Sequence, residues 1–166
     1  MSKKFTASDI VILASAVVLL IASFLTWIDF GNPRIGPIPP QLLQLLGPDA
    51  PQLLSSIPRG TQNAWDHFPG FVYPLIAGVI AGVQVVMEKV RPQMPGHVAG
   101  FSWTQIDLLL GIWALLSVIA VAFEDFGYGD KGIGLWLTLI AAAGLLVGAI
   151  LRLREPARVT AEPSAA

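Results

Sequence analysis

The 166-residue sequence contains no cysteine. This excludes disulfides, thiolate metal sites and cysteine nucleophiles together. Charged residues are also scarce, at 13% of the chain against 54% hydrophobic residues, which is outside the balance of an ordinary soluble domain. The formal net charge is only −1, so the composition gives no indication of a nucleic-acid partner. The high content of hydrophobic residues and the low content of charged residues predict a membrane protein that is surrounded mainly by lipid.

Four uncharged apolar runs are long enough to cross the hydrocarbon core of a membrane, which takes about 20 helical residues. None of them carries the polar face that helices of a soluble bundle show. We therefore predict an all-α integral membrane four-helix bundle within residues 1–154. Its helices are expected at about residues 9–29, 68–88, 104–123 and 132–152.

The distribution of positive charge predicts the orientation, because Lys and Arg residues are retained on the cytoplasmic side of a membrane. With four alternating helices, most of the ten Lys and Arg residues fall on one side, and the exceptions are Arg34, Arg59 and Lys131. This predicts a multi-pass plasma-membrane protein with both termini in the cytoplasm. The tail at residues 155–166 is too polar to bury a core, so we expect it to be disordered.

The first outer loop, at residues 30–69, holds most of the thirteen prolines and is much longer than a helix hairpin needs. The sequence Pro-Gln-Leu-Leu begins at Pro40 and again at Pro51, which predicts two short helices on the membrane surface or over the bundle. A simple spacer is the alternative. Because spacers are rarely rich in leucine, we predict a partner-binding surface formed by Leu42, Leu43, Leu45, Leu46, Leu53 and Leu54.

Small residues recur at four-residue spacing in the second and fourth helices. Such motifs let helix backbones approach closely where lipid supplies no hydrophobic drive. We expect them to pack inside the bundle, and association with another subunit is the alternative. In the first helix, Ser8, Ser15 and Ala22 follow the seven-residue spacing of a packing seam. The predicted packing residues are Gly78, Gly82, Gly134, Ala141, Gly144 and Gly148.

The pattern Thr-x-x-Asp opens the first helix at Thr6 and Asp9 and the third helix at Thr104 and Asp107. We predict that both pairs cap their helices, since an acid at this position also favours the helix dipole. A role as proton or ion ligands is the alternative. Gln84 and Glu88 could join Asp107 in a small polar cluster. The hairpin of the first and second helices resembles that of the third and fourth, which leaves open whether the chain contains an internal duplication. The motifs Gly78-x-x-x-Gly82 and Gly144-x-x-x-Gly148 would then correspond to each other.

Several acidic residues fall on the predicted outer side and could form a mouth that concentrates cations. Solvated side chains, or pairs with Arg34, Arg59 and Lys131, are the alternative. His67 and His97 fall on opposite sides of the membrane and cannot share a metal. The candidate acidic cluster comprises Asp29, Asp66, Glu124, Asp125 and Asp130.

Three short motifs lie at the membrane ends of the expected helices: Phe24-Leu25-x-Trp27, Asn63-Ala64-Trp65 and Gly132-x-Gly134-x-Trp136. With these motifs the chain resembles a family of small four-helix membrane proteins common in actinobacteria. The likeness covers most of the chain from Asp9 to Arg154. The chain departs from that family in having Thr26 where proline is frequent, and in its longer outer loop. The resemblance implies a fold and a membrane location, and no particular activity.

The sequence brings together no nucleophile with a base and an orienting group, and no metal-ligand set. We therefore predict a non-catalytic protein without cofactor or metal. The leading hypothesis is an accessory or assembly subunit of a larger cell-envelope complex, which contacts lipid and either another membrane protein or a second copy of itself. The alternative is a small oligomeric channel or carrier for an ion or lipid.

Overall fold

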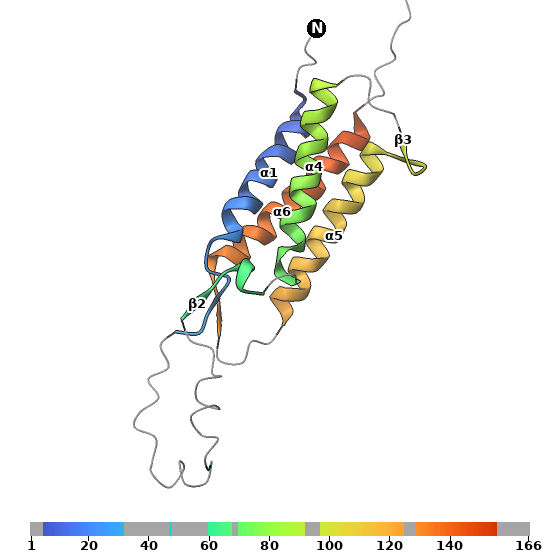
Figure 1. Cartoon of the computed structure of the whole chain (residues 1–166). Helices are drawn as coiled ribbons and strands as arrows, with labels where there is room; N and C mark the ends of the chain where they lie inside the picture. The colour runs from blue at the N-terminus through green and yellow to red at the C-terminus, as the bar shows by residue number, and fades with distance from the viewer. Residues whose placement is uncertain are drawn as a thin grey trace, which may run out of the picture.

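The structure is a computed structural model that describes residues 5–31, 47, 60–67, 70–91, 97–124 and 129–155. Most of these residues are helical (Figure 1). Two short 3-10 helices, η2 (Ala64–His67) and η3 (Gly70–Val72), precede the second long helix. The four long helices are α1 (Ala7–Ser23), α4 (Tyr73–Val90), α5 (Trp103–Phe123) and α6 (Ile133–Arg154).

Three helical stretches are long and apolar enough to cross a membrane, namely Gly70–Val90, Trp103–Phe123 and Ile133–Arg154. The first helix is apolar but shorter, and it ends at Ser23 instead of continuing to about residue 29 as expected. After Ser23 the chain tightens into a turn, because the N–H groups of Phe24 and Leu25 bond to carbonyls only three residues back. After this turn the chain forms a short strand at Ile28–Asp29.

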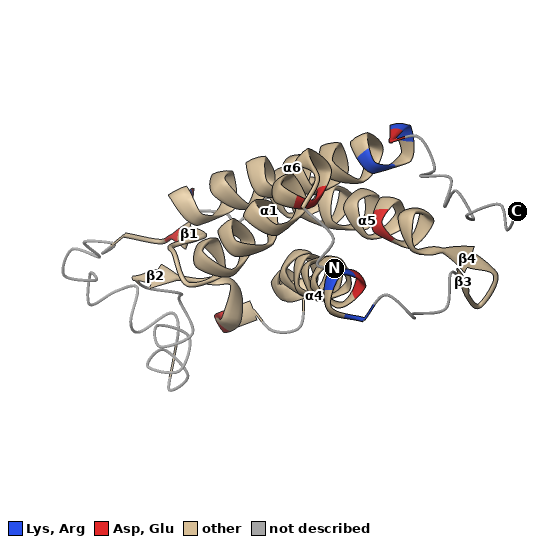
Figure 2. Cartoon of the chain, turned by 90° about the horizontal axis from the view of Figure 1, so that it is seen from above, with Lys and Arg blue, Asp and Glu red and all other residues tan. Residues whose placement is uncertain are grey.

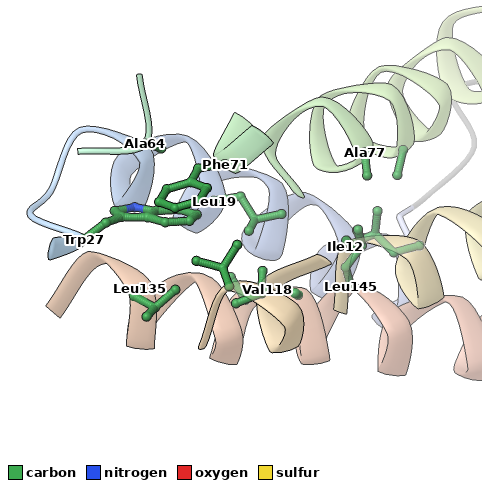
Figure 3. Close-up of a cluster of buried hydrophobic side chains, with 14 of the residues drawn as sticks. Ile12, Leu19, Trp27, Ala64, Phe71, Ala77, Val118, Leu135 and Leu145 are labelled. Atoms are coloured by element: carbon green, nitrogen blue, oxygen red, sulfur yellow. The ribbon is translucent and has the colours of Figure 1, made fainter. Parts of the chain in front are cut away.

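The four helices pack side by side, with α1 and α5 each lying between α4 and α6. Their facing side chains fill the interior. Figure 3 shows Ile12 and Leu19 of α1 packed with Ala77 of α4, Val118 of α5 and Leu145 of α6. Each of these side chains is at most 1% exposed, so the described part of the chain has an apolar core between its helices.

Glycines of α4 and α6 allow α1 to approach both helices closely. A Cβ atom added at Gly78 would lie 2.6 Å from the Leu19 side chain, and one at Gly82 would lie 3.2 Å from Ala16. One added at Gly144 would lie 2.6 Å from Ser15 Oγ, and one at Gly148 would lie 2.7 Å from Ile12 Cγ1. The small-residue motifs therefore lie at contacts within one chain, and Ser8, Ser15 and Ala22 are buried on the same helix.

The packing of these glycines does not follow the internal duplication that the sequence leaves open. A duplication of the two hairpins would place Gly144 against α5, as Gly78 lies against α1. Both glycines instead lie against α1, and α5 approaches α6 through its own glycine, Gly111, beside Leu146. The two glycine motifs are thus not equivalent in the structure.

Short strands lie at both ends of the long helices. At one end, β1 (Ile28–Asp29) lies between β2 (Thr61–Gln62) and β5 (Asp130–Lys131), antiparallel to both. Ile28 is opposite Gln62 on one side and Lys131 on the other. At the other end, β3 (His97–Val98) and β4 (Phe101–Ser102) form a hairpin. Positive φ angles at Ala99 and Gly100 fit the two-residue turn that favours the twist of paired strands.

Candidate functional site

Five charged residues meet at the end of the molecule where α1 begins and α6 ends. We call them the ionic cluster, and every long helix contributes at least one of them. Figure 2 shows acidic residues on α1 and α5 and charged residues near the ends of α4 and α6. The members of the ionic cluster are Asp9, Glu88, Lys89, Asp107 and Arg152.

Arg152 of α6 lies at the centre of the ionic cluster. Its Nη1 donates to Asp107 Oδ2 at 2.6 Å, and its Nη2 donates to Glu88 Oε2. Nη2 also lies 3.6 Å from Asp9 Oδ1. The side chain is only 10% exposed, and a planar guanidinium can bond several carboxylates at fixed angles. One cation therefore connects α6 with each of the other three long helices.

Asp9 has two roles in the structure. Its Oδ2 accepts the Thr6 N–H at 2.9 Å while Thr6 Oγ1 accepts the Asp9 N–H, so the predicted capping box of the first helix is confirmed. The same carboxylate forms an ion pair with Lys89 of α4 and is 1% exposed. Asp9 therefore both caps α1 and connects α1 with α4.

The expected cap at Thr104 and Asp107 is wrong. Ser102 caps α5 instead: its Oγ accepts the Gln105 N–H at 3.3 Å, and Gln105 Oε1 accepts the Ser102 N–H at 2.9 Å. Thr104-x-x-Asp107 and Ser102-x-x-Gln105 both fit the sequence pattern of a capping box. The hairpin β3–β4 decides between them, because it places Ser102 at the start of the helix. Asp107 consequently lies inside the helix, where its 1% exposed carboxylate meets Arg152.

The sequence allows Glu88 to join Asp107 in a polar cluster, and the structure connects the two through Arg152, which bonds both. Gln84, one turn before Glu88, donates from Nε2 to the Trp103 carbonyl at 3.1 Å. The sequence alone does not identify Arg152 and Lys89 as members of the ionic cluster, because both fit equally well as charges that set the orientation. Their positions inside the last turns of α6 and α4, level with Asp9 at the start of α1, are the signal that could have identified them.

A second feature lies at the opposite end of α1, where β1 joins both ends of the outer loop to α6. The Trp27 N–H donates to the Gln62 carbonyl at 2.8 Å, and Phe30 and Gly60 continue this ladder. On the other edge, the Gly132 N–H donates to the Trp27 carbonyl at 2.7 Å. We call this feature the strand clamp; it comprises Trp27–Gly31, Gly60–Gln62 and residues 130–134.

Aromatic side chains pack beneath the strand clamp. Trp27 is 2% exposed, donates from Nε1 to the Ala22 carbonyl at 2.9 Å and stacks on Phe71 with ring centroids 5.5 Å apart. Ala64 of η2 is fully buried beside them (Figure 3). Trp27 follows α1, whereas Ala64 belongs to η2 and Phe71 to η3, so the apolar core extends directly into the base of the outer loop.

Of the described acidic residues on the outer side, Asp29 and Asp66 bond backbone N–H groups of local turns, Glu124 is the C-cap residue of α5, and Asp130 lies in β5. Asp29 accepts the Gly31 N–H at 2.8 Å, and Asp66 accepts the Asn63 N–H at 2.7 Å. Lys131 donates to the Ala122 carbonyl. Within the described ranges, no group of three or more His, Cys, Asp or Glu residues could hold a metal. Asp125 and the leucines of the predicted partner surface lie outside the described residues.

The chain matches no protein-family model, no curated protein and no solved structure. Its resemblance to the small actinobacterial four-helix proteins stays a prediction.

Proposed function

We propose that this chain is a non-catalytic integral membrane protein that presents its outer loop to another protein of the cell envelope. In this role it acts as an accessory or assembly subunit of a larger complex. The strand clamp is the observation that carries the proposal. It fixes the base of a long, leucine-rich loop beside the ends of the helices.

The exposed surface of the helices supports a membrane location. Large apolar side chains are exposed on each long helix, including Ile21 on α1, Val83 on α4, Leu116 on α5 and Ile140 on α6. In water such a surface would be unfavourable, whereas lipid is as apolar as these side chains. With about 1.5 Å per residue, α1 is somewhat shorter than a bilayer core, and the apolar residues up to Ile28 extend it.

The strand clamp supports a binding role because it limits the freedom of the loop that it holds. Residues 31 and 60 are hydrogen-bonded to each other, with the Gly60 N–H 3.0 Å from the Gly31 carbonyl. The two ends of the outer loop therefore lie side by side at the strand clamp. Holding the ends of a recognition loop on a rigid base reduces the ordering entropy lost on binding.

A channel or carrier is the second candidate, and the filled interior supports it less well. Ile12, Leu19, Val118 and Leu145 occupy the space between the described helices, and Arg152 bridges the helices at one end. A passage for an ion or lipid would therefore have to form between several copies of the chain.

Single cysteines test the proposed topology directly, since the sequence has none of its own. Cysteines at Gln44 and at the exposed position Asp130 should react with an impermeant thiol reagent added to intact cells. Cysteines at Gln93 and Ser164 should react only after the membrane is opened, because both termini are proposed to be cytoplasmic. Mass shifts on gels measure the labelling. Reaction of the Gln93 variant in intact cells would contradict the orientation.

Replacing residues 41–57 with a Gly/Ser linker of equal length tests the recognition role. The described helices and the strand clamp are unchanged in this variant, so insertion and yield should be retained. We expect co-purifying envelope proteins to be lost in mild detergent, as measured by quantitative mass spectrometry.

A matched pair of variants separates leucine contacts from loop length. Changing Leu42, Leu43, Leu53 and Leu54 to Ser should reproduce the loss of partners. Changing Gln41, Gln44 and Gln52 to Ser should not. Recovery of every partner by the leucine variant would show that these side chains are not the recognition surface.

A further inference from the structure

Two buried oxygen atoms beside the ionic cluster accept no hydrogen bond from the described residues. They are Oδ1 of Asp107 and Oε1 of Gln84. Asp107 is 1% exposed and Gln84 is 4% exposed. A buried polar atom without a partner is unfavourable, and more so when the group is charged. Both atoms therefore require a donor.

The two oxygens belong to adjacent layers of the contact between α4 and α5. Gln84 and Glu88 lie one turn apart on α4, and Trp103 and Asp107 lie one turn apart on α5. Gln84 bonds the Trp103 carbonyl in one layer, and Arg152 connects Glu88 with Asp107 in the next. Because Gln84 Nε2 already donates to Trp103, its Oε1 is the end of the amide that remains to be satisfied.

The charges of the ionic cluster are unbalanced in the same place. The groups that face Asp107 are Arg152 of α6, Glu88 of α4 and Asp9 of α1, and Lys89 pairs with Asp9. Among the described residues of the ionic cluster, three carboxylates thus face two cations when every group is ionised. An uncompensated negative charge in a buried site close to lipid is unfavourable.

We propose that Asp107 and Gln84 form a proton-binding site, in which Oδ1 of Asp107 carries a proton and donates it to Oε1 of Gln84. A single proton satisfies both oxygens and makes the ionic cluster neutral. Oδ2 of Asp107 remains an acceptor for Arg152. The site is independent of the recognition role proposed for the outer loop.

Asp107→Asn tests this site because an asparagine reproduces the protonated acid. Its side-chain oxygen can accept from Arg152 and its amide can donate to Gln84. The apparent Tm of the purified variant in mild detergent should stay within about 2 °C of the unaltered protein. Asp9→Asn is the control, because it removes a carboxylate that pairs with Lys89 and Arg152, and it should lower the apparent Tm by at least about 6 °C.

Infrared spectroscopy measures the proton itself. The unaltered protein should show the carbonyl stretch of a protonated carboxylic acid, and Asp107→Asn should lack it. Gln84→Met should shift this band to higher frequency, since the acceptor of its hydrogen bond is lost. This variant keeps the test decisive even where Asp107→Asn fails to fold.

Three outcomes would overturn the proposal. One is the absence of any protonated carboxyl band at Asp107. Another is an Asp107→Asn variant that is destabilised as much as Asp9→Asn, because the carboxylate is then ionised and needed as an ion. The third is a specific effect of sodium on thermal stability. In this outcome sodium chloride raises the apparent Tm of the unaltered protein, choline chloride does not, and neither salt raises the apparent Tm of Asp107→Asn. That result would assign the site to a metal cation.

Discussion

Arg152→Met is expected to destabilise the folded protein by about 3–5 kcal/mol, the range found when one partner of a buried ion pair is removed. Methionine keeps much of the aliphatic length of arginine but provides no donor. The carboxylates of Asp9, Glu88 and Asp107, each on a different helix, would lose the cation that bonds or faces them. Loss of one side chain should therefore loosen α6 from the other three helices.

The apparent Tm in mild detergent and the yield of monodisperse protein measure this effect. Arg154→Met is the matched control, because Arg154 belongs to the same turn of α6 but is exposed, and exposed substitutions usually change stability by less than about 0.5 kcal/mol. Arg152→Lys should fall between the two, since an ammonium keeps the charge without the planar fork. Equal stability of the Arg152→Met and Arg154→Met variants would contradict the structural role of the ionic cluster.

Gly148→Leu is expected to destabilise the protein by about 3 kcal/mol, at the upper end of the usual range for an overpacked core. A Cβ at this position would lie 2.7 Å from Ile12 Cγ1 and 3.2 Å from the Ile12 backbone nitrogen. A flexible side chain could move away, but the backbone of α1 cannot move without separating the two helices. Folding and yield should fall together.

Val147→Leu provides the control, because Val147 is the neighbouring residue on α6 and is 51% exposed. Size-exclusion chromatography and thermal melting distinguish a folding defect from a loss of association. A Gly148→Leu protein that remains a well-folded monomer but no longer associates would show that this surface contacts another subunit instead of α1.

The sequence predicts the helices well because an uncharged apolar run has few alternatives in lipid. It fails at the end of α1, where Leu25, Trp27 and Ile28 are as suitable for a buried strand as for a helix. The structure at this point depends on hydrogen bonds between Trp27 and two residues that are distant in the sequence, Gln62 and Gly132. No local pattern around Trp27 contains that information.

The ionic cluster shows the same limit for side chains. Asp9, Asp107 and Glu88 can each be identified from the sequence as polar residues of apolar helices, and the sequence allows Glu88 to join Asp107 in a polar cluster. The cation that connects them, Arg152, lies in another helix and fits equally well as a simple orientation signal. Which charges pair depends on the arrangement of the helices around one another, and apolar helices are too alike for their sequences to determine that arrangement.

The position of Arg152 near the end of α6 has a consequence for biogenesis. Ribosomes complete α6 after α1, α4 and α5, so the acidic side chains of Asp107 and Glu88 are synthesised before the cation that bonds both of them. Until α6 is made, α1 also lacks its contact with Gly144 and Gly148. Synthesis of α6 supplies the cation and this glycine surface together, so the contacts of the ionic cluster can be completed only once α6 is present.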